Sequence, residues 1–321
     1  MSRELKSLSV VVPGLNEAET LPLLYDKLVQ ILGSREWQLE IVFVDDGSTD
    51  GTAQICADLH RQDPRFQFVS LSRNFGHQRA LTAGLDFCTG QAVAAMDADL
   101  QDSPDEIPDL VKMIHQEGYD LVSGWKKKRY DPLSKTIPTK LYNWATRRMS
   151  GIYLHDFNCG LKAYKKEVVK SLEIFGEMHR YIPVMAHREG FKKIGEKVVE
   201  HRARKYGHTK FGLERFINGP LDLLTIMFIS RFGKRPMHIF GTFGALMFIV
   251  GLTLSSYLII DKFLHLYVWH TKAPLLSDQA AFYIALTSMI IGTQLFLSGF
   301  IGELVTRNSS TRNNYKIREI L

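Results

Sequence analysis

Residues 92–108 read AVAAMDADLQDSPDEIP, a short apolar run followed at once by five acidic residues. The run Ala92–Met96 has the length and composition of a buried strand. A buried carboxylate is costly unless a positive group compensates it. The position of Asp97 and Asp99 directly after this strand raises the question of which cation, or which reaction, they serve.

The same arrangement recurs through the front half of the chain, where short apolar runs end in turn or acidic residues. These runs are LSVVVPG (8–14), EIVFVDD (40–46), FQFVSL (66–71) and DLVSG (120–124). Helix-like segments such as Glu17–Leu32 and Gly51–Arg61 lie between them. Strands that alternate with helices predict an α/β fold with a mostly parallel sheet covered on both faces.

Four aspartates fall at the ends of these strands: Asp45, Asp46, Asp97 and Asp99. Ligands of parallel sheets bind outside the carboxyl ends of the strands, so we expect these side chains to face one cleft. For Asp46, two interpretations stay open. The run VDDGSTDGT is either a turn and helix cap formed by Asp50, or a site where a carboxylate contacts a nucleotide base or ribose.

The motif Asp97-Ala98-Asp99 places two carboxylates on the same side of an extended chain, and Gln101 adds a carbonyl oxygen on that side. Hard oxygen ligands of this kind suit Mg²⁺ or Mn²⁺ that bridges to a diphosphate. The chain has no G-x-G-x-x-G after its first strand and no G-x-x-x-x-G-K-[ST]. We therefore expect this acidic edge to hold phosphate through a metal.

The acidic residues that follow are expected to be structural. Ser103 precedes Pro104, and Glu106 stands three residues after the serine. This spacing predicts an N-cap, a first-turn proline and a capping box at the start of a helix. Asp102 and Asp105 belong to the same segment and are assigned to it.

Two apolar segments near the C-terminus, Met237–Ile260 and Ala280–Gly302, contain no Asp, Glu, Lys or Arg. Each is longer than the roughly 20 residues that cross a bilayer core, so they predict two transmembrane helices. Basic residues precede the first segment and follow the second, and such flanks stay in the cytoplasm. We expect a multi-pass protein of the inner (cytoplasmic) membrane whose N-terminal domain and C-terminal tail are cytoplasmic.

Charge is divided unevenly along the chain. Residues 1–120 contain 9 Lys and Arg against 20 Asp and Glu, whereas residues 121–321 contain 31 against 14. A basic half can meet nucleic acid, anionic lipid or a phosphorylated substrate. Sequence-independent nucleic-acid binding does not explain two membrane spans, so no nucleic-acid partner is expected.

The chain is expected to have four parts. Residues 1–212 form the α/β domain, 213–235 amphipathic juxtamembrane helices, 236–302 a two-helix transmembrane anchor, and 303–321 a cytoplasmic tail. The three cysteines are far apart and form no C-x-x-C, which argues against a zinc site.

Six motifs in order carry a resemblance to a known family. They are VVVPGLNE (10–17), IVFVDDGSTDGT (41–52), LSRNFGHQRALTAGLD (71–86), MDADLQDSP (96–104), DFNCGLKAYKK (156–166) and KYGHTKFG (205–212). Together they resemble the family 2 glycosyltransferases, which have the Rossmann-like GT-A fold. Within that family the chain is similar to the polyprenyl-phosphate glycosyltransferases, such as bactoprenol glucosyltransferase, undecaprenyl-phosphate aminoarabinose transferase and dolichol-phosphate mannose synthase.

The resemblance implies roles for several groups of residues. Asp97 and Asp99 are the implied catalytic residues. The implied nucleotide-binding residues are Pro13, Glu17, Asp46, Asp97 and Ala98. The implied ligands of Mg²⁺ or Mn²⁺ are Asp99, Gln101 and Asp97. The implied acceptor-phosphate ligands are Lys126, Arg129, Arg204 and Lys210. The chain departs from the family at Leu15, where many relatives have an aromatic residue, and at Trp125, where mannose-transferring relatives often have arginine.

The expected reaction is a metal-dependent, inverting transfer of a sugar from a nucleotide sugar to undecaprenyl or another polyprenyl phosphate. UDP-glucose is the first expected donor, another UDP-sugar is nearly as well supported, and a GDP-mannose enzyme is an alternative. The resemblance also implies a homotetramer. A processive polysaccharide synthase would need more spans and a Q-x-x-R-W motif, and this chain has no Arg-Trp pair. A non-catalytic membrane-anchored nucleotide-sugar sensor or scaffold stays open.

Overall fold

The computed structural model describes residues 5–127, 133–172, 178–201, 236–272 and 274–308. The chain divides into two compact units, residues 1–223 and 224–321. The predicted amphipathic helices at 213–235 and most of the predicted tail lie outside the described residues. The four-part division therefore stays a prediction.

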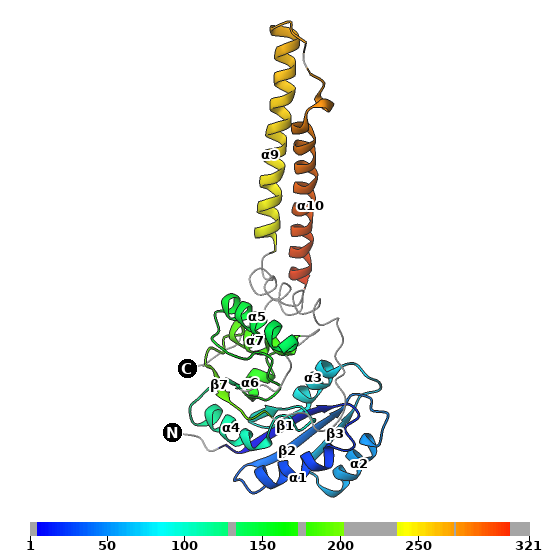
Figure 1. Cartoon of the computed structure of the whole chain (residues 1–321), viewed down its shortest axis with the longest axis vertical. Coiled ribbons are helices and arrows are strands. Elements are labelled where there is room, and N and C mark those ends of the chain that lie inside the picture. The colour runs from blue at the N-terminus through cyan, green and yellow to red at the C-terminus, as the bar shows by residue number, and fades with distance from the viewer. Residues whose placement is uncertain (1–4, 128–132, 173–177, 202–235, 273, 309–321) are drawn as a thin grey trace. The chain divides into compact units, whose positions relative to one another are not determined.

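The first unit is built on a seven-stranded sheet with the order β3-β2-β1-β4-β6-β5-β7 (Figure 1). Its strands are β1 (Ser7–Gly14), β2 (Gln38–Asp45), β3 (Phe66–Ser70), β4 (Ala92–Ala95), β5 (Leu121–Trp125), β6 (Lys162–Lys165) and β7 (Ile194–Val198). β6 is antiparallel to both of its neighbours, and the other pairs are parallel. The predicted α/β fold with a mostly parallel sheet is confirmed.

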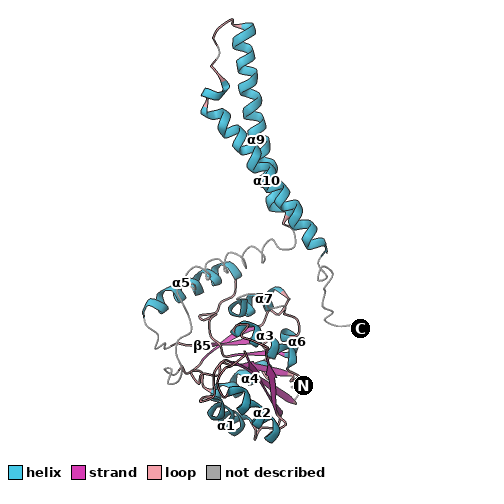
Figure 2. Ribbon diagram, turned by 90° about the vertical axis from the view of Figure 1, so that its right-hand side faces the viewer, coloured by secondary structure: helices cyan, strands magenta, loops and turns pink. Residues whose placement is uncertain are grey.

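Helices cover both faces of this sheet (Figure 2). On one face lie α1 (Leu21–Leu32), α2 (Thr52–Gln62) and α4 (Ile107–His115), and on the other lie α3 (His77–Phe87), α6 (Lys166–Val169) and α7 (Ile182–Arg188). Each face of the sheet has its own hydrophobic core. Alternate residues of a strand belong to different cores, because successive side chains of a strand point to opposite faces. The described residues of this unit also form η1 (Pro104–Glu106), α5 (Leu133–Ser150) and η2 (Met178–Tyr181).

The sequence analysis predicted neither β6 nor β7. β6 has only four residues, KAYK, and β7 (IGEKV) has the charged Glu196 at its centre and Lys197 beside it. Neither therefore has the apolar run that marks a buried strand. β6 is nevertheless hydrogen-bonded on both sides, to β4 and to β5. Tertiary pairing overrides the local sequence here.

The start of α4 differs from the prediction, because no capping box forms. The Ser103 hydroxyl donates to the Asp105 carboxylate at 2.7 Å. Glu106 Oε2 instead pairs with Lys197 Nζ at 2.7 Å. Pro104–Glu106 form a 3₁₀ turn, and the α-helix begins at Ile107. Asp105 and Glu106 are structural, as predicted, but through different partners.

The strand directions bring one set of segments to a common edge. The residues after β1, β2, β4 and β5 meet there because these strands run parallel. The residues before β6 join them because β6 runs the opposite way. Asp45, Asp46, Asp97 and Asp99 thus lie at one edge of the sheet, as predicted.

Within its described residues, 236–272 and 274–308, the second unit contains α9 (Met237–Phe263), the π-helix η3 (Leu264–Val268), η4 (Leu276–Asp278) and α10 (Ala280–Asn308). Two helices, within 237–268 and 280–305, are long and apolar enough to cross a membrane. Only 17% of the most apolar window of each is buried, unlike the core helix of a soluble protein. The prediction of two apolar helices of spanning length is confirmed.

α9 and α10 pack closely at glycines. A Cβ on Gly244 would lie 2.6 Å from the Gly292 carbonyl oxygen, and a Cβ on Gly292 would lie 2.6 Å from the Phe248 nitrogen. Such distances leave no room for a side chain, so the two backbones are in direct contact. Small residues at contacts between membrane helices allow this approach.

We expect Gly292→Leu to destabilise the second unit, because the new side chain would force α9 and α10 apart. Overpacking of this kind costs about 1–3 kcal/mol. Thermal unfolding of the full chain in detergent would show a lower transition temperature. The neighbouring substitution Thr293→Leu is the control, since Thr293 is exposed. Equal transition temperatures for the two variants would contradict the packing.

Candidate active site

Asp97 and Asp99 follow β4 in a tight turn in which Leu100 has a φ of +56°. Asp99 Oδ1 accepts the backbone N–H of Gln101 at 3.1 Å. Asp97 Oδ1 lies 3.4 Å from Nε2 of His77, the first residue of α3. The Asp97 carboxylate therefore lies beside the N-terminus of α3.

Gly160, in the loop before β6, packs directly against Asp97. A Cβ on Gly160 would lie only 2.6 Å from Asp97 Oδ2. The carboxylate is therefore held between His77 on one side and the Gly160 backbone on the other. Any other residue at position 160 would displace the Asp97 carboxylate from this position.

Lys162 is a buried cation beneath the same edge. Its side chain lines a small cavity together with Pro13, His77, Asp97 and Gly160. Its ammonium group donates to the Cys159 carbonyl oxygen. Burial lowers the pKa of Lys162, and the nearby Cys159, Asp156 and Asp97 oppose that shift. The structure thus brings the predicted nucleotide residues Pro13 and Asp97 to one cavity that also contains a lysine.

A second lysine, the partly buried Lys126, forms an ion pair with the buried Asp102 at 2.7 Å. Burial alone would raise the pKa of Asp102, but the nearby His201 and Lys126 hold it below its usual value. Lys126 follows β5 and was predicted to grip an acceptor phosphate. The structure gives it an internal partner, so that role stays a prediction.

The other three predicted acceptor-phosphate ligands, Arg129, Arg204 and Lys210, lie outside the described residues. Their role likewise stays a prediction. The basic motif KYGHTKFG also falls in that part of the chain.

Asp46 is buried and satisfied by backbone donors. Its two carboxylate oxygens accept the N–H groups of Phe75 at 2.7 Å and Gly76 at 2.9 Å. It therefore fixes the loop that leads into α3 and His77. Both oxygens of the Asp46 carboxylate thus already have partners within the protein. The predicted contact of Asp46 with a nucleotide base or ribose stays a prediction.

The loops after β1 and β2 are bound to each other. Glu17 N–H donates to the Thr52 hydroxyl at 2.9 Å, and Glu17 Oε2 accepts the Thr20 hydroxyl at 2.6 Å. Asp50 accepts hydrogen bonds from both the N–H and the hydroxyl of Thr52, which begins α2. The predicted helix cap by Asp50 differs in the structure, because the N-cap residue of α2 is Gly51 and Asp50 binds Thr52 from one position before it. Ala98 is buried behind the Asp97–Asp99 turn.

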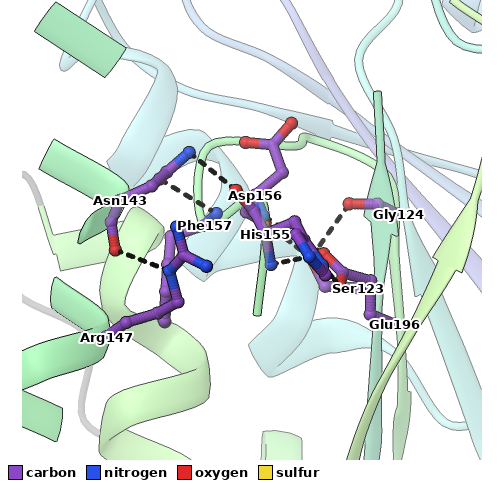
Figure 3. A network of polar contacts seen from close by, with 8 residues as sticks. All are labelled: Ser123, Gly124, Asn143, Arg147, His155, Asp156, Phe157 and Glu196. Atoms are coloured by element: carbon purple, nitrogen blue, oxygen red, sulfur yellow. Dashed lines mark hydrogen bonds and ion pairs between the residues drawn. The ribbon is translucent and has the colours of Figure 1, made fainter. Parts of the chain in front are cut away.

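Sequence reasoning missed the segment His155–Phe157, which Figure 3 shows at the centre of a polar network. Glu196 of β7 accepts the N–H groups of His155 at 2.7 Å and Asp156 at 3.1 Å. Asn143 of α5 accepts the N–H of Phe157 at 3.3 Å and donates to the His155 carbonyl at 2.9 Å.

Three consecutive backbone N–H groups of this segment are therefore bound by side chains from two other elements. These hydrogen bonds together fix the position of the buried Asp156 at this edge of the sheet. The signal was present in the motif DFNCGLKAYKK. Only the pairing of β6, however, shows that this motif lies at the same edge as Asp97.

The oxygen ligands at this edge fit a divalent metal of the nucleotide-site type. Among the described residues no group of three or more His, Cys, Asp or Glu side chains could hold a metal. Mg²⁺ in such sites needs only one or two carboxylates, because substrate phosphates and waters complete its coordination. Asp97 and Asp99 supply that number.

Loss of one partner of the Lys126–Asp102 pair is expected to destabilise the first unit. Lys126→Met leaves the buried Asp102 carboxylate with only the longer His201 contact at 3.8 Å, and breaking a buried ion pair costs about 3–5 kcal/mol. The double variant Lys126→Met/Asp102→Leu should recover most of that loss, because it removes both charges. Denaturant unfolding measures the free energy of unfolding of both variants. If Lys126→Met alone were harmless, the buried pair would not be the main role of this lysine.

The chain is similar to known proteins along nearly its whole length. The chain is 34% identical over 319 residues to the dodecaprenyl-phosphate galacturonate synthase of Rhizobium johnstonii, covering 98% of this chain and 92% of that protein. It is 32% identical over 304 residues to the undecaprenyl-phosphate 4-deoxy-4-formamido-L-arabinose transferase of Pseudomonas syringae pv. syringae, covering 94% and 86%.

Solved structures show the same fold. Glucosyl-3-phosphoglycerate synthase from Mycobacterium tuberculosis, in complex with Mn²⁺, UDP-glucose and phosphoglyceric acid, superposes with a TM-score of 0.53 at 21% identity, covering 70% of this chain and 79% of that one. Residues 9–173 match glycosyl transferase family 2. With this match and a relative 34% identical along nearly its whole length, the chain belongs to glycosyl transferase family 2.

Proposed function

We propose that this enzyme transfers a sugar from a nucleotide sugar to a polyprenyl phosphate at the cytoplasmic face of the inner membrane. The similarity to two polyprenyl-phosphate transferases along more than nine tenths of the chain carries the proposal. The acidic edge at Asp97 and Asp99 supports it, because it suits a diphosphate bound through a metal. The two apolar helices support it as well, because the acceptor is a membrane lipid.

We propose galacturonate as the transferred sugar and UDP as its carrier. The relatives are named for galacturonate and for 4-deoxy-4-formamido-L-arabinose, and glucose, which the motifs favoured, is in neither name. The galacturonate synthase is the more similar of these two, at 34% against 32% identity. The formamido-arabinose donor is the second candidate.

The acceptor itself supplies the nucleophile in this mechanism. A phosphate monoester has a second pKa near 6, so it is largely dianionic at neutral pH and needs little help from a base. Its oxygen attacks the anomeric carbon from the face opposite the leaving nucleoside diphosphate, which inverts the configuration. The main task of the protein is to hold two anions in line.

The residues at the acidic edge of the sheet have separate roles in holding the two substrates. Asp97 and Asp99 would hold Mg²⁺ or Mn²⁺, which when bound neutralises charge on the departing diphosphate. His77 and Gly160 keep the Asp97 carboxylate in place. Asp156 is held at the same edge by Asn143 and Glu196, where it can orient a bound substrate.

An assay with a panel of nucleotide sugars tests the proposal. The full chain would be mixed with undecaprenyl phosphate and Mg²⁺ or Mn²⁺, and the glycosyl-phosphoryl lipid detected by mass spectrometry. We expect product with UDP-galacturonate. Asp99→Ala should reduce the rate by about 100-fold or more, because a Lewis acid contributes several kcal/mol.

Asp58→Ala is the matched control for this assay, because Asp58 is a partly exposed aspartate of α2 whose side chain contacts Arg61 and Gln54 of the same helix. Its activity should equal that of the wild type. Nucleotide binding without product across the whole panel would favour the sensor or scaffold instead.

Gly160→Ala is expected to weaken Mn²⁺-dependent binding of UDP by about tenfold, because the added methyl group would displace the Asp97 carboxylate from a metal ligand position. Titration calorimetry with and without Mn²⁺ measures this effect. In an Asp97→Ala background the same glycine substitution should have no further effect, since the displaced group is gone. Additive losses in the two backgrounds would refute this role of Gly160.

A further inference from the structure

The outer face of α5 has an unusual composition for a soluble surface. Lys140, Trp144 and Arg148 are exposed and stand four residues apart, so they form one stripe along the helix. Trp144 is 60% exposed, and Tyr153, just beyond the helix, is 77% exposed. We call these four residues the α5 face.

Cationic side chains accompany the aromatic rings of this region. The guanidinium of Arg147 lies 5.6 Å from the centre of the Tyr153 ring. The ammonium of Lys127 lies 5.7 Å from the centre of the Trp125 ring, and that ring stacks on His155. Tryptophan and tyrosine with lysine and arginine are the residues that occupy the headgroup zone of a bilayer, where an aromatic ring has one apolar and one wet side.

The inner side of the same helix contacts the active site. Asn143 lies between two exposed positions of the stripe in sequence, and its buried amide holds the backbone on both sides of Asp156 (Figure 3). A helix with its side chains is about 10–12 Å across. With 3.6 residues per turn, Asn143 lies about 60° from Lys140 and about 100° from Trp144 around α5, so the Asp156 segment lies to the side of the α5 face, within about one helix diameter of it.

We propose that the α5 face docks on anionic lipid headgroups and so places the Asp156 segment at the level of the acceptor's phosphate. The lipid surface is the partner that fits, because the stripe pairs two cations with exposed aromatic rings and the same chain has two helices of membrane-spanning length. Delivery of the acceptor rests on the proposed function, whereas docking on lipid does not.

A site-specific fluorescent probe tests docking without any assay of activity. An environment-sensitive fluorophore would be attached to Lys140→Cys in the full chain, reconstituted in nanodiscs of phosphatidylcholine with or without phosphatidylglycerol. The three native cysteines are buried. Burial raises the pKa of Cys56 to about 12 and that of Cys88 to about 11, so these thiols react slowly.

The matched control is Lys112→Cys, an exposed lysine of α4. We expect the probe at position 140 to shift to the blue and to be shielded from aqueous iodide when phosphatidylglycerol is present. The probe at position 112 should not change. Equal exposure of both probes to iodide in all nanodiscs would overturn the proposal. Shielding at position 140 in detergent alone, without phosphatidylglycerol, would also overturn it and indicate a protein contact.

Kinetics test the consequence for the acceptor. Lys140→Gln/Arg148→Gln should raise the KM for a long polyprenyl phosphate in anionic nanodiscs by about tenfold, as expected for losing two basic residues at an anionic surface. The kcat should stay unchanged, as should the kinetics with a short, water-soluble polyprenyl phosphate. Lys112→Gln/Arg61→Gln removes the same charge from exposed positions of α4 and α2.

The two tests separate the proposals. A shielded probe together with no transfer of any sugar would retain docking and refute the proposed function. An unchanged KM for the long acceptor, in an enzyme that is active, would refute the role of the α5 face in acceptor delivery.

Discussion

The antiparallel pairing of β6 between β4 and β5 is the contact on which the rest of the site depends. Because β6 runs against its neighbours, the loop that precedes it lies at the edge where the other strands end. Gly160 then reaches the Asp97 carboxylate, and Asp156 lies at the same edge. A parallel β6 would place this loop at the opposite edge, far from Asp97.

Basic side chains of the protein itself lie along the acidic edge. Lys126 neutralises the buried Asp102, and His77 lies beside Asp97, with Lys162 buried below. Buried carboxylates persist because such partners offset the cost of removing them from water. The Asp97 carboxylate is thus already held in place by the protein, as in preorganised sites.

Three elements distant in sequence hold the Asp156 segment in one position. Asn143 comes from α5, Glu196 from β7 and the Ser123 hydroxyl from β5, 3.4 Å from the Asp156 carbonyl. α5 thus holds the backbone of this segment through the buried Asn143 and presents Lys140, Trp144 and Arg148 on its exposed side. In the docking that we propose, this one helix would relate a lipid surface to the Asp156 segment without any change in fold.

The sequence by itself determined the α/β class, the position of Asp97 and Asp99 at a strand end, and the two long apolar helices, because each rests on a local pattern of polarity. Only the tertiary structure decided the order of the strands, the presence of β6 and β7, and the partners of Lys126, Glu106 and Asp156. Those depend on contacts between residues up to about ninety positions apart, such as Glu106 with Lys197. The local pattern of polarity does not predict such contacts, because they form only when strands pair and side chains pack in the folded chain.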